Sequence, residues 1–372
     1  MVATILEHFS DLEDPRGREG RLHYLSDMVA IVCCAVICGA DEWTEIETFG
    51  KAKEAFFRKV LSLPHGIPSH DTFGRVFSAL RPESLERCFM SWTQALAEQS
   101  GGRLIAIDGK TLRRSFDRAA GKAAIHMVSA WSSDNALVFG QLATEAKSNE
   151  ITAIPKLLEL LDLQGATVTI DAEGCQKEIA RKIVDGGGDY VLALKANQPT
   201  MQEEVRLFLD DAIARGGKAS ALGFHQSIEG DHGRIETRRA WVSPEVGWFE
   251  DREQWKGLRS FIAVECERIV GEKTSCERRY FISSLTGSDA EAIAHAVRSH
   301  WSIENSLHWC LDVAFREDMS RIRQGHAAEN LSRIRRLGLG MLKRETSAKI
   351  GIKGKRLRAG WDEAYLLRVL AA

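Results

Sequence analysis

The order of short apolar runs and amphipathic segments between residues 103 and 198 is the feature that most constrains the fold of this chain. Seven segments follow one another as strand, strand, strand, helix, strand, helix and strand: 104–107, 125–131, 137–143, 151–163, 166–170, 175–184 and 190–194. Strand-like runs that alternate with helical periodicity favour a central sheet with helices packed against it. The sequence therefore predicts an α/β fold built on a mixed sheet.

The residues on either side of this pattern have a different periodicity. Residues 1–100 show helical spacing and predict a helical amino-terminal domain. Residues 199–287 contain β-like runs and predict a β-rich insertion, after which helical spacing returns at 288–345. We expect 101–198 and 288–345 to form one core domain and 346–372 to form a basic carboxy-terminal tail.

Two short helices in the amino-terminal region leave two interpretations open. Ser69 opens a helix that ends near Leu80, and Pro82 starts the next one. Short helices joined by a tight turn fit a helix-turn-helix with Thr72, Arg75 and Ser78 on one face. A small helical bundle without DNA contacts fits the same pattern equally well.

Length and charge limit the class of protein. The chain has 372 residues, more than the roughly 250–300 at which a single core stops growing, so two or three structural units are expected. Its 50 Lys and Arg against 52 Asp and Glu give a net charge of −2, which excludes a uniformly basic nucleic-acid binder. The average hides a tract at 321–358 with twelve basic and two acidic side chains, which would gain affinity for DNA by releasing counterions.

No segment predicts a membrane or secreted protein. The longest apolar run, Met28–Cys38, is shorter than the roughly 20 residues that span a bilayer. The amino terminus carries acidic residues and has no signal-peptide pattern. The eight cysteines contain no Cys-x-x-Cys pair, and we expect them to be reduced in a cytoplasmic protein.

Three carboxylates stand where they could carry chemistry. Asp108 and Asp171 each follow an apolar run, at the carboxyl end of a predicted strand where ligand sites of α/β sheets gather. Asp after a strand is also an ordinary turn residue. Glu304 lies in a helical stretch in which residues four apart form a polar stripe: His300, Glu304, His308 and Asp312. A zinc site built from the first three is a competing interpretation, although their spacing is not His-Glu-x-x-His.

Together with several motifs, these residues resemble the bacterial insertion-sequence transposases of the DDE type, in particular the ISAs-type, H-repeat-associated group. The resemblance covers about residues 5–370. It is carried by motifs in the family's order: Asp14-Pro-Arg-Gly, Ile67-Pro-Ser-His-Asp-Thr-Phe-Gly-Arg75, Ala-Ile-Asp108-Gly-Lys-Thr-Leu, Thr-Ile-Asp171-Ala, Leu-Lys195-Ala-Asn197-Gln198-Pro, Asp-His232-Gly-Arg234-Ile-Glu236-Thr-Arg238 and His300-Trp-Ser-Ile-Glu304-Asn-Ser-Leu-His308-Trp. The chain departs from the Tyr, Arg and Lys positions that flank the glutamate in related transposases, where it has Val297, His300 and Leu311.

The resemblance implies a ribonuclease H-like catalytic core with Asp108, Asp171 and Glu304 as catalytic and metal-binding residues. Two Mg²⁺ ions are expected, with Mn²⁺ as a substitute, because hard cations prefer oxygen ligands. The implied reaction is hydrolysis at the ends of a mobile element, followed by strand transfer by the freed 3′-hydroxyl. An alternative is a catalytically silent or domesticated relative that only binds DNA.

The implied partners are the terminal inverted repeats and the target, both double-stranded DNA, bound by a homodimer in the cytoplasm at the nucleoid. No membrane partner is expected. Basic and polar residues near the carboxylates, in the insertion and in the basic tract are the candidates for DNA contacts: Lys110, Arg113, Arg114, Lys195, Asn197, Arg234, Arg238, Arg321, Arg323 and Arg335. In the insertion, a cross-strand ion-pair ladder is the other interpretation.

Overall fold

The computed structural model describes most of the chain: residues 7–17, 21–97, 104–117, 121–144, 150–216, 222–231, 233–286 and 290–372. It divides into two compact units. The first unit consists of Met1–Gly102, Gly109–Asn149 and Ile303–Ala372, and the second of Arg103–Asp108 and Glu150–Ser302. The helical amino-terminal region and the carboxy-terminal helices therefore belong to one unit, which the expected domain boundaries separate.

Helices dominate the first unit. Its elements are α2 (Leu25–Ile37), α3 (Trp43–Ala52), α4 (Glu54–Phe57), α5 (His70–Ala79), α6 (Pro82–Ala97), β2 (His126–Ser132), β3 (Leu137–Thr144), the π-helical η5 (Ile303–His308), α11 (Trp309–Val313), η6 (Glu317–Met319), α12 (Ala327–Arg344), α13 (Ile352–Trp361) and α14 (Glu363–Ala371). The start of α5 is as predicted, because the Ser69 hydroxyl accepts a hydrogen bond from the backbone N–H of Thr72.

Strands dominate the second unit. Its elements are α7 (Glu150–Leu160), β4 (Thr167–Ile170), η3 (Ala172–Gly174), α8 (Lys177–Asp185), β5 (Asp189–Leu194), α9 (Pro199–Ala214), β6 (Gly223–Asp231), β7 (Arg234–Ser243), η4 (Glu250–Gln254), β8 (Ser260–Val270), β9 (Lys273–Ser283) and α10 (Ala290–Ser302). Strand β1 (Leu104–Thr111) begins in this unit and ends in the first.

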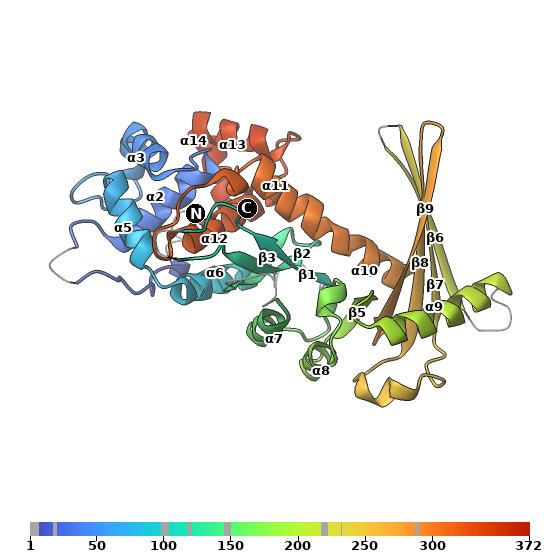
Figure 1. Ribbon diagram of the computed structural model, residues 1–372. Coiled ribbons are helices and arrows are strands. Elements are labelled where there is room, and N and C mark those ends of the chain that lie inside the picture. Colours follow the sequence, from blue (N-terminus) through green and yellow to red (C-terminus); the bar gives the residue numbers. More distant parts are fainter. Residues whose placement is uncertain are drawn as a thin grey trace. The chain divides into compact units, whose positions relative to one another are not determined.

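The strands form a mixed sheet with the order β3-β2-β1-β4-β5-β9-β8-β7-β6 (Figure 1). β1, β4 and β5 are parallel, while β2 and β3 pair antiparallel. The first five strands in this order match the ribonuclease H-like core that the family resemblance implies, and α7 and α8 form the crossovers between its parallel strands. The predicted α/β fold is confirmed.

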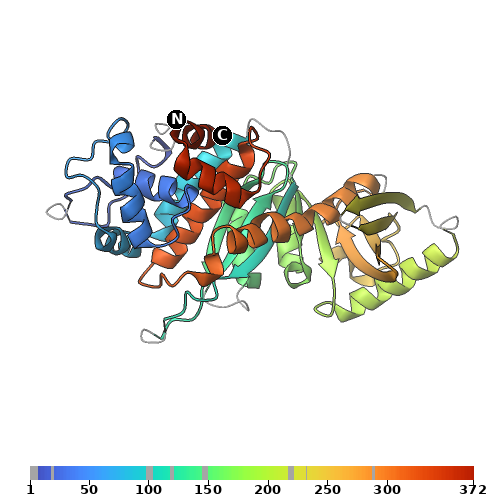
Figure 2. The same ribbon diagram turned by 90° about the horizontal axis from the view of Figure 1, so that it is seen from above.

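The expected β-rich insertion continues the same sheet as four long antiparallel strands, β6 to β9. Two helices cover its opposite faces (Figure 2). On one face Trp248 stacks between Phe208 of α9 and Phe261 of β8, with ring centroids 4.8 and 5.2 Å away. On the other face Ile262, the next residue of β8, joins Ile293 of α10 in the core. Successive strand residues point to opposite faces, so the two helices enclose these strands.

Two segments differ from the sequence-based expectation. Strand β1 continues to Thr111, so Asp108 lies within the strand and not after it. Residues 346–372 form α13 and α14, which bury apolar side chains against the unit, so the expected tail is folded. Among the described residues, no helix is long and apolar enough to cross a bilayer.

The core of the first unit is built around α12, which is buried along most of its length. Two of its buried arginines are paired with carboxylates of other elements. Arg333 donates to Glu86 of α6 at 2.7 Å, and Arg336 donates to Glu317 of η6 at 3.0 Å. Both members of the second pair are 0% exposed, and the hydroxyl of Ser332 also donates to Glu317 at 2.8 Å.

The buried Arg336–Glu317 pair gives a stability prediction. Arg336→Met leaves Glu317 buried without its main counter-charge, so it should lower the free energy of unfolding by about 3–5 kcal/mol. Arg336→Met combined with Glu317→Met should be clearly less destabilised than the sum of the two single variants, because no unpaired charge remains. Urea denaturation of the four proteins measures this coupling. Additive losses would contradict it, and the exposed Arg321→Met is the control that should leave stability unchanged.

Candidate active site

Asp108 and Asp171 occupy matching positions on neighbouring parallel strands of the second unit. Ile107 of β1 pairs in register with Ile170 of β4, so each aspartate is the next residue after a matched pair. Adjacent strands lie about 4.8 Å apart, and residues in register point to the same face. The two carboxylates therefore lie on neighbouring strands at the level where β4 ends.

The loop after β4 is built so that Asp171 is held in one orientation. Its Oδ1 accepts hydrogen bonds from the backbone N–H groups of Glu173, at 3.0 Å, and Gly174, at 3.4 Å. The turn needs a glycine at position 174, because the Cβ of any other residue there would lie 2.2 Å from Cγ2 of Ile170. The second oxygen of the carboxylate makes neither of these bonds.

The segment after β5 supports the same loop. Nδ2 of Asn197 donates to the carbonyl of Ala172, and Nε2 of Gln198 donates to the carbonyl of Cys175 at 3.1 Å. The neighbouring Lys195 is exposed. The structure thus places the predicted Lys195 and Asn197 beside the loop that follows Asp171, with the amide of Asn197 in a supporting role.

His300 fixes the helix that precedes the third carboxylate. Its Nδ1 lies 3.1 Å from the hydroxyl of Thr169, which shares a strand face with Asp171. Burial lowers the pKa of His300, although the carboxylate of Asp171 acts in the opposite direction. Helix α10 therefore crosses the sheet face beside the two aspartates.

Glu304 is exposed and belongs to the first unit, at the start of the π-helical turn η5. A π-helical turn adds about one residue to each repeat, which breaks the predicted four-residue stripe: Glu304 is exposed whereas His308 is buried. Among the described residues, no three His, Cys, Asp or Glu side chains are close enough to hold a metal ion as they stand.

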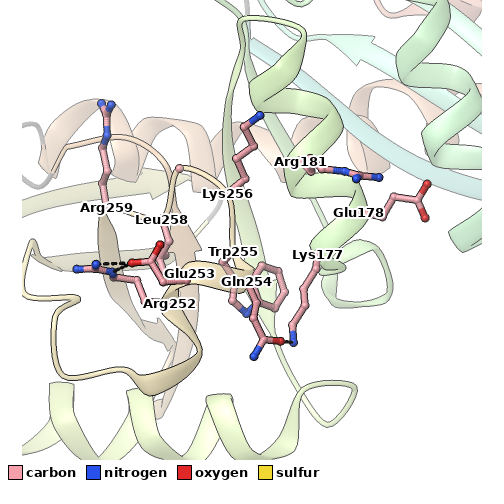
Figure 3. Close-up of a pocket in the computed structure, with 11 residues that line it drawn as sticks. Lys177, Glu178, Arg181, Arg252, Glu253, Gln254, Trp255, Lys256, Leu258 and Arg259 are labelled. Carbon is pink, nitrogen blue, oxygen red and sulfur yellow. Dashed lines mark hydrogen bonds and ion pairs between the residues drawn. The ribbon is translucent and has the colours of Figure 1, made fainter.

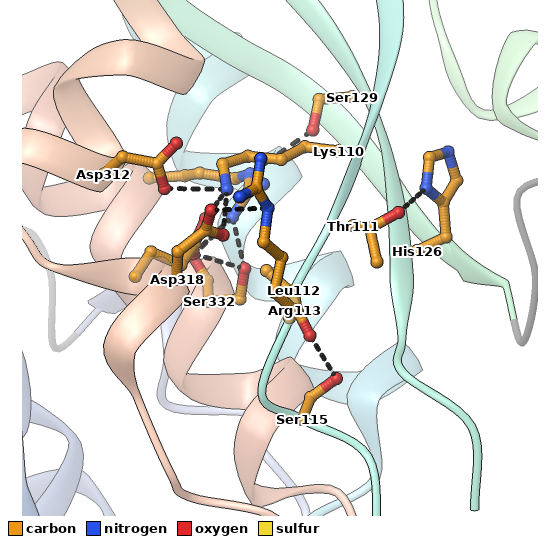
Figure 4. A network of polar contacts seen from close by, with 12 residues as sticks. Lys110, Thr111, Leu112, Arg113, Ser115, His126, Ser129, Asp312, Asp318 and Ser332 are labelled. Carbon is orange, nitrogen blue, oxygen red and sulfur yellow. Dashed lines mark hydrogen bonds and ion pairs between the residues drawn. The ribbon is translucent and has the colours of Figure 1, made fainter.

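Lys110 lies two residues after Asp108 and is surrounded by carboxylates of the first unit (Figure 4). Its ammonium group is 2.7 Å from Asp318, 2.8 Å from Asp312 and 4.0 Å from Glu317. The side chain is 8% exposed. These contacts leave Lys110 no surface for a DNA phosphate, and they join the end of β1 to the segment after the Glu304 helix. Neither Asp312 nor Asp318 was predicted from the sequence as a partner of Lys110.

The other predicted DNA contacts near β1 and in the basic tract differ in exposure. Arg113 is 79% exposed and contacts Asp318 at 3.0 Å. Arg323 donates to the carbonyl of Arg114 at 2.8 Å, and Arg321 is exposed. Arg321 and Arg323 line an open cavity of about 670 Å³, and Arg75 of α5 lines it as well.

Arg335 contradicts the expectation that the whole basic tract is an exposed arm. It is 2% exposed and donates to the carbonyl of Asp41 at 3.3 Å. Lys355 and Arg356 of the same tract are also buried. Their charges are used inside the protein, so a contact between Arg335 and DNA has no surface in this structure.

In the insertion, the predicted arginines form ion pairs on the sheet. Arg234 contacts Glu236 at 3.0 Å, and Arg238 contacts Glu229 of the neighbouring strand at 2.9 Å. Arg238 is 16% exposed, against 41% for Arg234. The structure therefore contains ion pairs of the kind that the ladder interpretation expects. His232 of this motif lies outside the described residues.

His308 gives a prediction on pH. Burial and the nearby charges of Arg336 and Lys110 lower its pKa to about 3, whereas a histidine in the unfolded chain titrates near 6.5. Between these values the unfolded chain binds a proton that the folded chain does not. His308 should therefore reduce stability as the pH falls below about 6.5, by up to about 1.4 kcal/mol per pH unit.

His308→Asn should remove that part of the pH dependence. Urea denaturation over the range from neutral to mildly acidic pH measures the slope for both proteins. The exposed His326→Asn is the matched control and should keep the original slope. An unchanged slope in His308→Asn would show that this histidine is not responsible.

Comparison with known proteins gives the family. The family model described as "Transposase DDE domain" matches residues 99–337, and the one described as "DDE_Tnp_1-associated" matches residues 6–93. The chain is 44% identical to "Putative transposase YncI" of Escherichia coli O157:H7, over 100% of this chain and 95% of that protein. It is 40% identical to "H repeat-associated putative transposase YhhI" of Escherichia coli K12, over 100% of this chain and 98% of that protein. An "Uncharacterized protein in dhlA 3'region" of Xanthobacter autotrophicus is 47% identical, over 75% and 93%. The chain belongs to the DDE transposase family, whose substrate is DNA.

Proposed function

We propose that this chain is an active DNA transposase that hydrolyses phosphodiester bonds at the ends of an insertion sequence. The freed 3′-hydroxyl then attacks a phosphodiester of the target DNA. The observation that carries the proposal is the pair of carboxylates, Asp108 and Asp171, at matched positions of neighbouring parallel strands in a member of this family.

We infer that Asp108, Asp171 and Glu304 hold two Mg²⁺ ions, for which Mn²⁺ is a substitute. The donor set fits this metal, because all three residues offer carboxylate oxygens and hard cations prefer oxygen ligands. When bound, such a metal pair activates the attacking oxygen and stabilises the leaving oxygen without a protein base.

The residues around the carboxylates support positioning. Two backbone N–H groups fix the orientation of Asp171 through one of its oxygens, so the other is available for a metal. The Thr169–His300 contact fixes the end of α10, and Glu304 follows His300 by four residues. The proposal thus assigns the helix the role of presenting its glutamate and the sheet the role of presenting its two aspartates.

The DNA partners that we propose are the terminal inverted repeats and a target duplex, bound by a homodimer in the cytoplasm at the nucleoid. Joining two ends requires two active sites, which favours a dimer on DNA. Of the predicted contacts, Arg113, Lys195 and Arg321 have the exposure that a phosphate contact needs. Asn197, Arg234, Arg238 and Arg323 are engaged with protein groups, and Arg114 is only partly exposed, so these five are weaker candidates.

The test of the catalytic assignment is a nicking assay. Asp108→Ala, Asp171→Ala and Glu304→Ala should each lower the rate of Mg²⁺-dependent nicking of a duplex that carries the terminal repeat by at least about a thousandfold, a loss typical of removing a central catalytic group. Binding of the same duplex without metal should remain. Asp134→Ala, in the exposed turn after β2, is the control that should keep full activity.

Full nicking by Asp108→Ala would overturn the assignment. Binding of the terminal repeat by the unaltered protein without any Mg²⁺-dependent nicking would instead favour the catalytically silent relative.

A further inference from the structure

The second unit has a cationic surface that contains none of the proposed catalytic or DNA-binding residues. It is formed by the start of α8 and by the loop that runs from η4 to β8, which together enclose an open cavity of about 640 Å³ (Figure 3). Five cationic and two acidic side chains line it: Lys177, Arg181, Arg252, Lys256 and Arg259, with Glu178 and Glu253. We call it the α8–η4 surface.

The backbone of this surface is held in place. Gly257 has a φ of 73°, a conformation that favours glycine, and a Cβ there would lie 3.1 Å from Cγ2 of Val184 on α8. Trp255 and Leu258 on either side are buried. The loop is therefore anchored against the helix, and its charged side chains are presented on a fixed support.

The loop contacts both ends of α8. Gln254 accepts a hydrogen bond from Lys177 at the first residue of the helix, and Lys256 pairs with Asp185 at the last. The first and last residues of α8 are eight positions apart, so at 1.5 Å per residue they lie about 12 Å apart along the helix axis, which corresponds to between three and four base-pair steps of duplex DNA. The helix begins six residues after Asp171, so its first end lies on the carboxylate side of the sheet.

Two of the five cations have no partner in the part of the chain that the structure describes. Lys177, Arg252 and Lys256 have partners in Gln254, Glu253 and Asp185. Among the residues that the structure describes, the guanidinium groups of Arg181 and Arg259 have neither a hydrogen-bond nor an ion-pair partner, and both side chains are exposed. Arg181 lies one turn after Lys177 on the same face of α8.

We propose that the α8–η4 surface binds the phosphate backbone of the DNA that flanks the cleavage site, with Arg181 and Arg259 as direct contacts. This inference rests on the proposed function, which supplies DNA as the partner. Guanidinium groups match phosphate oxygens in a bidentate geometry, and a concave surface with an excess of one charge concentrates the opposite charge. The contacts are to phosphates only, so they do not depend on base sequence.

The test measures binding and its dependence on salt. Arg181→Ala combined with Arg259→Ala, in the full chain, should weaken binding of a terminal-repeat duplex and of a scrambled duplex of the same length by the same factor. The slope of log K against log salt should become less negative by about 2, because each phosphate contact contributes about 0.9. Fluorescence anisotropy without divalent metal keeps binding separate from cleavage.

Two further variants control for charge and folding. Lys59→Ala combined with Lys156→Ala removes the same charge from exposed positions that do not line this cavity and should keep the slope. Arg181→Lys combined with Arg259→Lys keeps both charges and should restore most of the binding, even where the alanine variant is less stable.

An unchanged slope in the alanine variant would overturn the proposal. The proposal would also be overturned if the alanine variant kept its affinity for DNA but lost binding of inorganic pyrophosphate in calorimetry. The surface would then bind a small anion and not DNA. The proposed catalytic function fails by a different outcome, since Asp108→Ala should lose nicking and keep the salt slope.

Discussion

The first unit depends on the neutralisation of positive charges inside its core. A buried guanidinium without a counter-charge costs several kcal/mol, and α12 carries Arg333 and Arg336 into the interior. Their partners, Glu86 and Glu317, lie on α6 and η6. A different packing of these elements would leave charges unpaired, so the ion pairs select one arrangement of helices around α12.

The sequence predicted the elements of the sheet well and the use of charge poorly. Strands from 104 to 194 were found because alternation of apolar residues is a local property. The burial and pairing of Arg333 could not be predicted from neighbouring residues, because its partner Glu86 is 247 residues away. A tract with twelve cations therefore resembles a DNA-binding arm in sequence although part of it is core. The π-helical turn at Glu304 escaped prediction because the four-residue stripe assumes a regular α-helix.

The candidate site combines features of different predictability. Asp108 and Asp171 were recognisable because each follows an apolar run, and the register of β1 with β4 explains why two positions 63 residues apart in sequence become neighbours. Lys110 was predicted as a DNA contact from its place after Asp108 alone. Its partners Asp312 and Asp318 come from a segment some 200 residues later, and only the fold shows that its charge is already balanced.

Because Lys110 and Arg335 are buried in the protein, affinity for DNA is expected from other cations. A cation contributes to phosphate binding only if its charge is exposed and not already matched by a carboxylate. Lys110 and Arg335 fail this condition, whereas Arg181 and Arg259 meet it without belonging to any motif or basic run in the sequence. In a chain with a net charge of −2, affinity for DNA must come from such local groups. The relevant quantity is therefore the exposed, unmatched charge on each surface, which neither composition nor the density of basic residues along the chain supplies.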